Sequence, residues 1–227
     1  INSGIGFANY SAHCNSSGWS SPSFITSDIA NLTNNQKYGL WVGNCCQSSK
    51  FEVAECFAEA TLRASNKGAV GYIGASDNTY WNEDFWWSVG FKTVSLNPTY
   101  DPNHLGAYDR LFHTQNEDPS AWCSTQGQLI TGGNLAVQES TSTLKLYYWE
   151  VYNLMGDPSL ECKFICPTSV DFINQTVTAD TTVISCGSIN VQNVSVENGA
   201  KLTLDAATET TINGDFEVTL GSELEVK

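Results

Sequence analysis

Two short apolar runs on either side of a helical stretch constrain the fold of this chain more than any other feature. The runs, YGLWVG at 38–43 and GAVGYIG at 68–74, are bounded by polar residues and have the length of buried strands. Between them, residues 51–66 carry apolar side chains mostly at helical spacing, and Lys67 and Gly68 close the stretch. A strand, a helix and a strand with short connections form a parallel crossover unit. The sequence therefore predicts an α/β domain with a parallel sheet flanked by helices.

Further elements are expected on both sides of this unit. An apolar run at 5–11 ends before His13, and residues 26–32 suit a short helix with a capping hydroxyl at its start. A helix at 144–155 is expected to close the region before Gly156.

The pattern changes after Pro167. The remaining residues alternate Val, Ile, Thr and Leu with polar residues and contain no Trp. Residues 194–204 superpose on 216–226 with an offset of 22 residues (216 minus 194). Such a repeat predicts stacked coils of a short β-solenoid, and a small β-sandwich with tight hairpins is the alternative. We therefore expect an α/β domain at 1–165 and an all-β module at 166–227.

The charge balance limits what the chain binds. Its 227 residues include 24 acidic and 10 basic side chains, a net charge of -14. Nucleic-acid binding depends on Lys and Arg that neutralise phosphates, so we expect no nucleic-acid partner. No apolar run approaches the ~18 residues of a transmembrane segment, and none is expected.

The cysteines bear on the compartment. There are eight of them, in a chain poor in Lys and rich in Ser, Thr and Asn, which favours a secreted or cell-surface protein. Cys162, Cys166 and Cys186 straddle the junction between the two regions, where a disulfide among them would fix the angle. The chain begins at Ile1 without a signal peptide, so we expect it to be a piece of a longer secreted precursor.

The residues that carry chemistry are His13 and the doublet Cys45 and Cys46. Each follows a predicted strand, and sites in open α/β sheets form beyond the carboxyl ends of the strands. A thiolate beside an imidazole attacks a carbonyl, and the imidazole protonates the leaving amine. Gly43 would let the turn before the doublet aim backbone amides at the oxyanion. A structural histidine and a buried or disulfide-bonded cysteine are the alternative interpretation.

Six motifs occur in a fixed order: NYSAHCNSSGW at 9–19, VGNCC at 42–46, ECFAEA at 55–60, GAVGYIGAS at 68–76, YWNEDFWWSVG at 80–90 and NLMGDPSL at 153–160. Together they resemble the gingipain family of secreted cysteine endopeptidases, which have a caspase-like fold and are exported by Bacteroidota through type IX secretion. The resemblance covers about residues 6–160. Its Gly-Asn-Cys-Cys and Tyr-Trp-x-Glu-Asp stretches look closer to the arginine-specific members.

The resemblance implies roles for individual residues. His13 matches the family's catalytic histidine and Cys46 its nucleophile, with Cys45 as a buried neighbour. Trp81 or Trp86 is similar to the tryptophan that walls the primary specificity pocket, and a core position is the alternative for each.

The resemblance also bears on cofactors. The chemistry implies none, but family members bind structural calcium. Glu83 and Asp84 form a candidate calcium site, and a solvated acidic turn explains them equally well.

The chain departs from the family in two respects. Cys14 follows His13 where the family has a glycine whose amide helps to form the oxyanion hole, and a disulfide between Cys14 and Cys46 would silence the nucleophile. The family's catalytic domain also extends well upstream of its histidine. A parallel sheet without its leading strands exposes an edge, so we expect an upstream fragment of the precursor or self-association to cover it.

Three functions follow from these observations. The leading hypothesis is an extracellular cysteine endopeptidase acting on proteins or peptides through Cys46 and His13. The second is a catalytically inactive homologue that serves as a structural, adhesive or filament-forming protein. The third is a carbohydrate-binding surface made of Trp81, Trp86 and Trp87.

Overall fold

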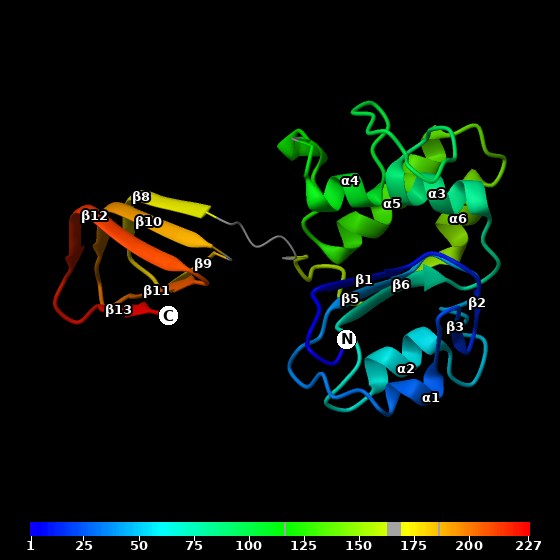
Figure 1. The fold of residues 1–227 in the computed structure, drawn as a ribbon, viewed down its shortest axis with the longest axis horizontal. Coiled ribbons are helices and arrows are strands. Elements are labelled where there is room, and N and C mark those ends of the chain that lie inside the picture. Colours follow the sequence, from blue (N-terminus) through cyan, green and yellow to red (C-terminus); the bar gives the residue numbers. More distant parts are fainter. Residues whose placement is uncertain (116, 163–168, 186) are drawn as a thin grey trace. The chain divides into compact units, whose positions relative to one another are not determined.

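The computed structural model describes residues 1–115, 117–162, 169–185 and 187–227. The chain forms two compact units, Ile1–Phe164 and Ile165–Lys227, each described here by itself (Figure 1). Within the described ranges, no helix has the length and apolar character needed to cross a membrane.

The first unit is built around a four-stranded sheet in the order β1-β5-β6-β7. Its strands are β1 (Phe7–Tyr10), β5 (Leu40–Gly43), β6 (Gly71–Ala75) and β7 (Tyr152–Gly156). β1, β5 and β6 run parallel, and β7 pairs with β6 in the antiparallel direction.

Helices cover both faces of this sheet (Figure 1). α1 (Thr26–Ile29) and α2 (Phe57–Arg63) lie on one face. The other face carries α3 (Trp81–Val89), α4 (Ala107–Phe112), α5 (Gln126–Glu139) and α6 (Lys145–Val151). A small antiparallel sheet of β2 (Cys14–Asn15), β3 (Gly18–Ser20) and β4 (Ser23–Ile25) and a 3₁₀ helix at Pro119–Ala121 complete the unit. The predicted parallel sheet flanked by helices is confirmed.

The alternation of side chains along β5 divides the core into two. Leu40 and Val42 are fully buried in the cluster formed with α3 to α6, whereas Trp41 between them is fully buried on the opposite face. There Trp41 packs with Phe57 of α2 and Tyr72 of β6. This strand is apolar on both faces because both are covered by helices.

Two predicted helices are shorter than expected. In the 51–66 stretch the helix begins only at Phe57. The Glu59 carboxylate accepts a hydrogen bond from the backbone N–H of Cys56 (2.8 Å) and so caps the first turn. In the 144–155 stretch the helix ends at Val151, and the following residues form β7. The expectation of a helix to 155 was therefore wrong, because these residues pair with the edge of β6.

The second unit contains six strands: β8 (Ser169–Val177), β9 (Thr181–Ser185), β10 (Ser188–Val196), β11 (Lys201–Ala206), β12 (Glu209–Val218) and β13 (Glu223–Val226). They form two parallel three-stranded sheets, β12-β10-β8 and β13-β11-β9. The register pairs Val194 with Phe216, the same two residues that align in the sequence repeat. Cys166 and Cys186, for which a disulfide at the junction was expected, lie outside the described residues.

Candidate functional site

Two neighbouring parallel strands end together at one edge of the first unit's sheet. The register pairs Tyr10, the last residue of β1, with Gly43, the last residue of β5. The backbone N–H of Asn44 donates to the Tyr10 carbonyl (2.8 Å) and extends this alignment by one residue. His13 and Cys46 follow shortly after these two strand ends. The sheet therefore directs both predicted catalytic residues to the same edge.

A small cavity of about 50 Å³ lies at this edge. It is lined by Ala12, His13, Cys46, Thr79, Trp81 and Asp84. The structure thus brings the predicted His13 and Cys46 together with one of the two predicted tryptophans, Trp81. It also places the hydroxyl of Thr79 and the carboxylate of Asp84 in the same cavity. The sequence had not predicted a part in substrate binding for either residue.

Cys46 is a free, half-buried thiol in this cavity. The backbone N–H of Thr79 donates to its Sγ at 3.4 Å. The next residue, Gln47, has a φ of 57°, a left-handed conformation that is uncommon for residues other than glycine. Its N–H donates to the Asp77 carbonyl (3.0 Å), which fixes the turn that presents the thiol. An unusual backbone at such a position is typical of functional sites.

The disulfide in this region joins Cys14 to Cys45, not to Cys46. The Cys14–Cys46 hypothesis was therefore wrong. Cys45 is 1% exposed and points into the core, whereas Cys46 points into the cavity, since adjacent residues project to different sides. The bond connects the residue after His13 to the residue before Cys46, and it leaves the predicted nucleophile free.

His13 is positioned through its backbone and its ring. Its carbonyl accepts hydrogen bonds from the Tyr10 hydroxyl (2.8 Å) and from the backbone N–H of Ser20 (3.0 Å). Its exposed imidazole meets the Trp81 ring edge-to-face, with centroids 5.3 Å apart. The imidazole is therefore held against Trp81 in the lining of the cavity to which Cys46 also contributes.

Asp84, in the first turn of α3, presents its carboxylate to the cavity within a set of hydroxyl donors. The Thr79 hydroxyl donates to Oδ2 (2.6 Å), and the hydroxyls of Tyr148 and Tyr152 donate to Oδ1 (2.8 and 2.9 Å). Burial raises the pKa of Asp84 to about 6, although these three hydrogen bonds oppose the shift. The two tyrosines come from α6 and β7, and sequence reasoning missed them.

Asn44 ties the end of β5 to the helix that carries Asp84. Its side-chain amide donates to the backbone carbonyl of Asp84 (2.8 Å) and to the Ser88 hydroxyl (2.6 Å). Its oxygen shares the single proton of the Tyr152 hydroxyl with Asp84 Oδ1. Asn44 is 3% exposed. The segment that carries Cys46 and the helix that carries Asp84 are therefore held in one rigid arrangement.

The other two tryptophans of the sequence cluster lie elsewhere. The Trp86 indole donates to the Lys92 carbonyl (2.9 Å) and is not part of the cavity lining. Trp87 is fully buried, donates to Asn134 (3.1 Å) and belongs to the core. A carbohydrate platform of Trp81, Trp86 and Trp87 is therefore wrong, because at least one of its rings is inaccessible.

The two residues of the candidate calcium site, Glu83 and Asp84, have different partners in the structure. Glu83 is buried and accepts a hydrogen bond from the Ser142 hydroxyl (2.5 Å), while the Asp84 carboxylate lines the cavity and accepts from the hydroxyls of Thr79, Tyr148 and Tyr152. Calcium needs six to eight oxygen ligands, whereas these two carboxylates point to different partners. Within the described part of the chain, no three His, Cys, Asp or Glu side chains are grouped to hold a metal.

Gly43 has a different role from the one expected. It lies within β5, before the turn, and a Cβ at this position would come within 2.0 Å of the Tyr72 hydroxyl. The glycine therefore accommodates the close approach of Tyr72 beneath the site, and its contribution is packing.

The other free thiols among the described residues, those of Cys56, Cys123 and Cys162, are poor nucleophiles. Burial raises the pKa of Cys56 to about 11 and that of Cys162 to about 12, and it also raises the pKa of Cys123. None of the three lines the cavity that contains His13.

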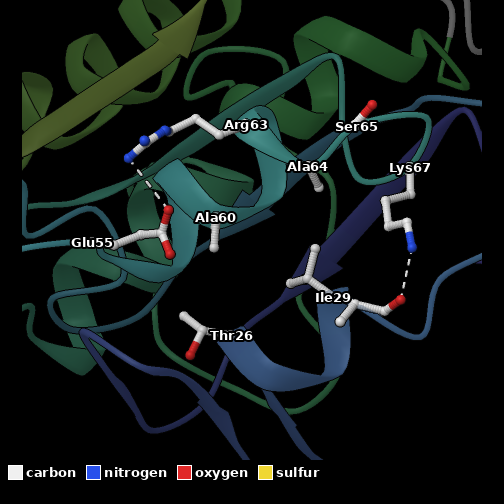
Figure 2. A pocket seen from close by; sticks show the side chains of 9 residues that line it. Thr26, Ile29, Glu55, Ala60, Arg63, Ala64, Ser65 and Lys67 are labelled. Carbon is white, nitrogen blue, oxygen red and sulfur yellow. Dashed lines mark hydrogen bonds and ion pairs between the residues drawn. The ribbon is translucent and has the colours of Figure 1, made fainter.

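A larger hollow of about 480 Å³ lies between α1 and α2 (Figure 2). It is lined by Thr26, Ile29, Ala30, Glu55, Ala60, Arg63, Ala64, Ser65 and Lys67. Its charged groups are satisfied locally, by the Arg63–Glu55 ion pair (3.3 Å) and by the Lys67 ammonium on the Ala30 carbonyl (2.7 Å). It contains neither a thiol nor an imidazole, so it offers no chemistry comparable to that of the smaller cavity.

Comparison with known proteins gives a consistent result for the first unit. Residues 1–163 match the family described as Peptidase family C25. A Lys-gingipain of Porphyromonas gingivalis is 38% identical over 168 residues, which are 70% of this chain and 9% of the relative. A gingipain R2 of the same species is 24% identical over 194 residues, which are 82% of this chain and 24% of the relative. The expected closeness to arginine-specific members was therefore wrong, because the identity to the Lys-gingipain is the higher of the two.

Solved structures of proteases also resemble this chain. A structure described as "Structure of Protease" superposes with a TM-score of 0.65 at 35% identity, over 74% of this chain and 38% of that chain. The Arg-specific cysteine proteinase gingipain R superposes with a TM-score of 0.61 at 22% identity, over 80% of this chain and 38% of that chain, and shows the fold alone. The chain spans less than a tenth of the Lys-gingipain and about two fifths of these solved chains.

Proposed function

Because this chain belongs to peptidase family C25, we propose that it hydrolyses peptide bonds with Cys46 as the nucleophile and His13 as the general acid and base. The observation that carries the proposal is the cavity that the free thiol of Cys46 and the imidazole of His13 both line. A thiolate and an imidazole at one strand edge are the groups that acyl transfer requires. The substrate is a protein or peptide.

The residues act in a fixed sequence. His13 takes the thiol proton of Cys46, and the thiolate attacks the carbonyl carbon of the scissile bond. His13 then protonates the leaving amine, and the resulting thioester is hydrolysed by a water that His13 deprotonates. The N–H of Thr79, 3.4 Å from Sγ, stabilises the thiolate before attack.

Cys14 is compatible with an oxyanion hole at the position where the family has glycine. It is not among the residues with a positive φ, so its backbone does not need glycine. Its side chain is turned away into the bond with Cys45, and its amide is retained. This supports an active enzyme over the inactive homologue.

We propose lysine as the residue before the scissile bond. Asp84 offers a carboxylate at the cavity beside Cys46, where a bound ammonium group gains a charge-assisted hydrogen bond. Trp81 would flank the aliphatic part of the same side chain. The 38% identity to a Lys-gingipain, against 24% to a gingipain R2, also supports lysine over arginine.

The preference for lysine is expected to depend on pH. With a pKa of about 6, Asp84 is ionised above this pH and loses its charge below it. The ratio of kcat/KM between a lysyl substrate and its norleucyl counterpart should therefore fall as pH decreases through about 6. Taking the ratio cancels any effect of pH that is common to both substrates. A ratio that stays constant from about pH 5 to pH 8 would contradict the role of Asp84.

The disulfide is expected to stabilise the site region. It closes a loop with a sequence separation of 31, so the double variant Cys14→Ser, Cys45→Ser should lose about 3–4 kcal/mol of unfolding free energy. Chemical denaturation of the oxidised protein and the variant measures the difference. A reductant should destabilise the wild type to the same extent and leave the variant unchanged. Equal stability of both proteins would contradict the expectation.

A further segment of polypeptide is proposed to cover β1. This strand forms one edge of the sheet and pairs with β5 on its other side. An open parallel edge invites pairing with another strand, from an upstream fragment of the precursor or from a second copy. A complex of RgpB pro- and mature domains superposes on this chain with a TM-score of 0.59, and its second component supports the fragment. Mass spectrometry of the native protein identifies what is bound.

The second unit is proposed to be a short β-solenoid on a secreted protein. Its parallel pairing at a repeat of about 22 residues supports stacked coils over hairpins. The disulfide of the first unit supports an oxidising compartment. A filament-forming role rests on the edge strands β12 and β13, and concentration-dependent assembly in sedimentation experiments would favour it.

A further inference from the structure

We propose that Thr79 is a positioning residue that links Asp84 to Cys46. Asp84 is the carboxylate that binds the substrate's basic side chain, and Cys46 is the thiol that attacks the peptide bond. The inference rests on the proposed function. It assigns Thr79 two tasks, one for its hydroxyl and one for its backbone N–H. Both groups face the cavity that contains Cys46 and Asp84.

The first observation is the direction of the hydrogen bonds at the Thr79 hydroxyl. Its proton donates to Asp84 Oδ2 at 2.6 Å, because an ionised carboxylate only accepts. The lone pairs of Oγ1 are then free for a donor, and the Cys46 sulfur lies 3.8 Å away. The backbone carbonyl of Thr79 also lies 3.8 Å from this sulfur, so the thiol has two possible acceptors on Thr79. Thr79 therefore contacts both the thiol and the carboxylate.

The second observation concerns the backbone of Thr79. Its N–H points at the Cys46 sulfur from 3.4 Å, and this interaction strengthens when the thiol ionises. The N–H does not depend on the side chain at this position. The two tasks can therefore be separated by substitution.

The third observation is that the segment around Thr79 is fixed on both sides. The Asp77 and Asn78 carbonyls accept the Gln47 N–H (3.0 Å) and the Tyr147 hydroxyl (2.9 Å). On the other side, the N–H of Tyr80 donates to the hydroxyl of Tyr148 (2.9 Å), which also binds Asp84. Asp84 and the segment beside Cys46 are therefore joined through the hydroxyls of Thr79 and Tyr148.

The consequence is a coupling between recognition and chemistry. Thr79 contacts both the Asp84 carboxylate through its hydroxyl and the Cys46 sulfur through its N–H, so an ammonium group bound to Asp84 also steadies the residue beside the nucleophile. Thr79 keeps the carboxylate oriented toward the incoming ammonium group. The lysyl side chain is therefore expected to improve the attack step as well as binding.

The test compares Thr79→Val with Thr79→Ser on lysyl and norleucyl substrates of otherwise identical sequence. Valine has the shape of threonine and keeps the N–H but lacks the hydroxyl, and serine keeps both. We expect Thr79→Val to lower the lysyl-to-norleucyl ratio of kcat/KM by about tenfold or more, the value of one hydrogen bond to a charged group. The lysyl substrate should show both a higher KM and a lower kcat. Alkylation of Cys46 by iodoacetamide should stay within about twofold of wild type, because the N–H remains.

Thr79→Ser should restore the ratio to within about threefold of wild type. An unchanged ratio in Thr79→Val would overturn the inference, as would an equal loss on both substrates with slowed alkylation, which indicates a general structural effect. A serine variant that behaves like the valine variant would also overturn it. A wild-type protein that cleaves neither substrate and shows no selective alkylation of Cys46 rejects the proposed function itself, and with it this inference.

Discussion

Replacing Cys46 by alanine is expected to reduce peptide hydrolysis by at least about 10⁴-fold, because it removes the thiol of the cavity that also contains His13. His13→Ala should cause a loss of similar size, since the two residues act as a unit and their effects are not additive. The double variant should therefore be no less active than either single variant. Initial rates on a lysyl peptide substrate, measured in the native protein that carries each substitution, test this directly.

The matched control is Cys162→Ala. Cys162 is also a free, half-buried thiol, but it lies outside the cavity and burial raises its pKa to about 12. We expect its replacement to leave kcat and KM within about twofold of wild type. Retention of activity in Cys46→Ala would contradict the assignment of the nucleophile.

Replacing Asp84 by asparagine is expected to weaken the preference for lysine and to raise the stability of the folded protein at neutral pH. The uncharged amide cannot form an ion pair with an ammonium group, so kcat/KM for lysyl substrates should fall by about 10²-fold or more, while kcat/KM for norleucyl substrates should change little.

The same substitution bears on stability. Folding raises the pKa of the Asp84 carboxyl from 3.8 to about 6, which means that the folded protein disfavours the ionised form. Stability is therefore lost as pH rises from about 4 to 6. At neutral pH the asparagine variant should be more stable, by on the order of 1 kcal/mol, or about 2–4 °C in Tm.

The neighbouring carboxylate provides the control for this experiment. Glu83→Gln changes the same charge on the same helix, but Glu83 binds Ser142 and does not line the cavity. Its lysyl-to-norleucyl ratio should stay at the wild-type value. If both variants lose the lysine preference equally, the effect comes from the net charge of the region, and Asp84 does not bind the substrate's side chain.

Local patterns account for the parts of the fold that were predicted correctly. The strands at 40–43 and 71–75 are apolar on both faces because helices cover both faces, and that produces an uninterrupted apolar run in the sequence. The repeat after Pro167 predicted the register that pairs Val194 with Phe216, because residues stacked in neighbouring strands have similar surroundings. The antiparallel β7 was missed because its residues read equally well as the end of a helix.

The composition of the site was only partly predictable. His13 and Cys46 were identified from motifs, but the set that surrounds Asp84 comes from separate elements, with Tyr148 and Tyr152 lying 64 and 68 residues away in the chain. Nothing in a local pattern shows that these hydroxyls converge. The disulfide partner of Cys14 was also beyond a sequence argument, because Cys45 and Cys46 are adjacent and differ only in the side to which they point.

The most direct test of this account is site-resolved alkylation of the native protein. Brief treatment with limiting iodoacetamide at about pH 6, followed by peptide mass spectrometry, measures which thiol is ionised. We expect label on Cys46 and none on Cys56, Cys123 or Cys162, with the Cys14–Cys45 peptide pair recovered intact. His13→Ala should abolish the selective label. Uniformly slow labelling, or labelling of Cys46 that is independent of His13, would contradict a working thiol and imidazole at this site.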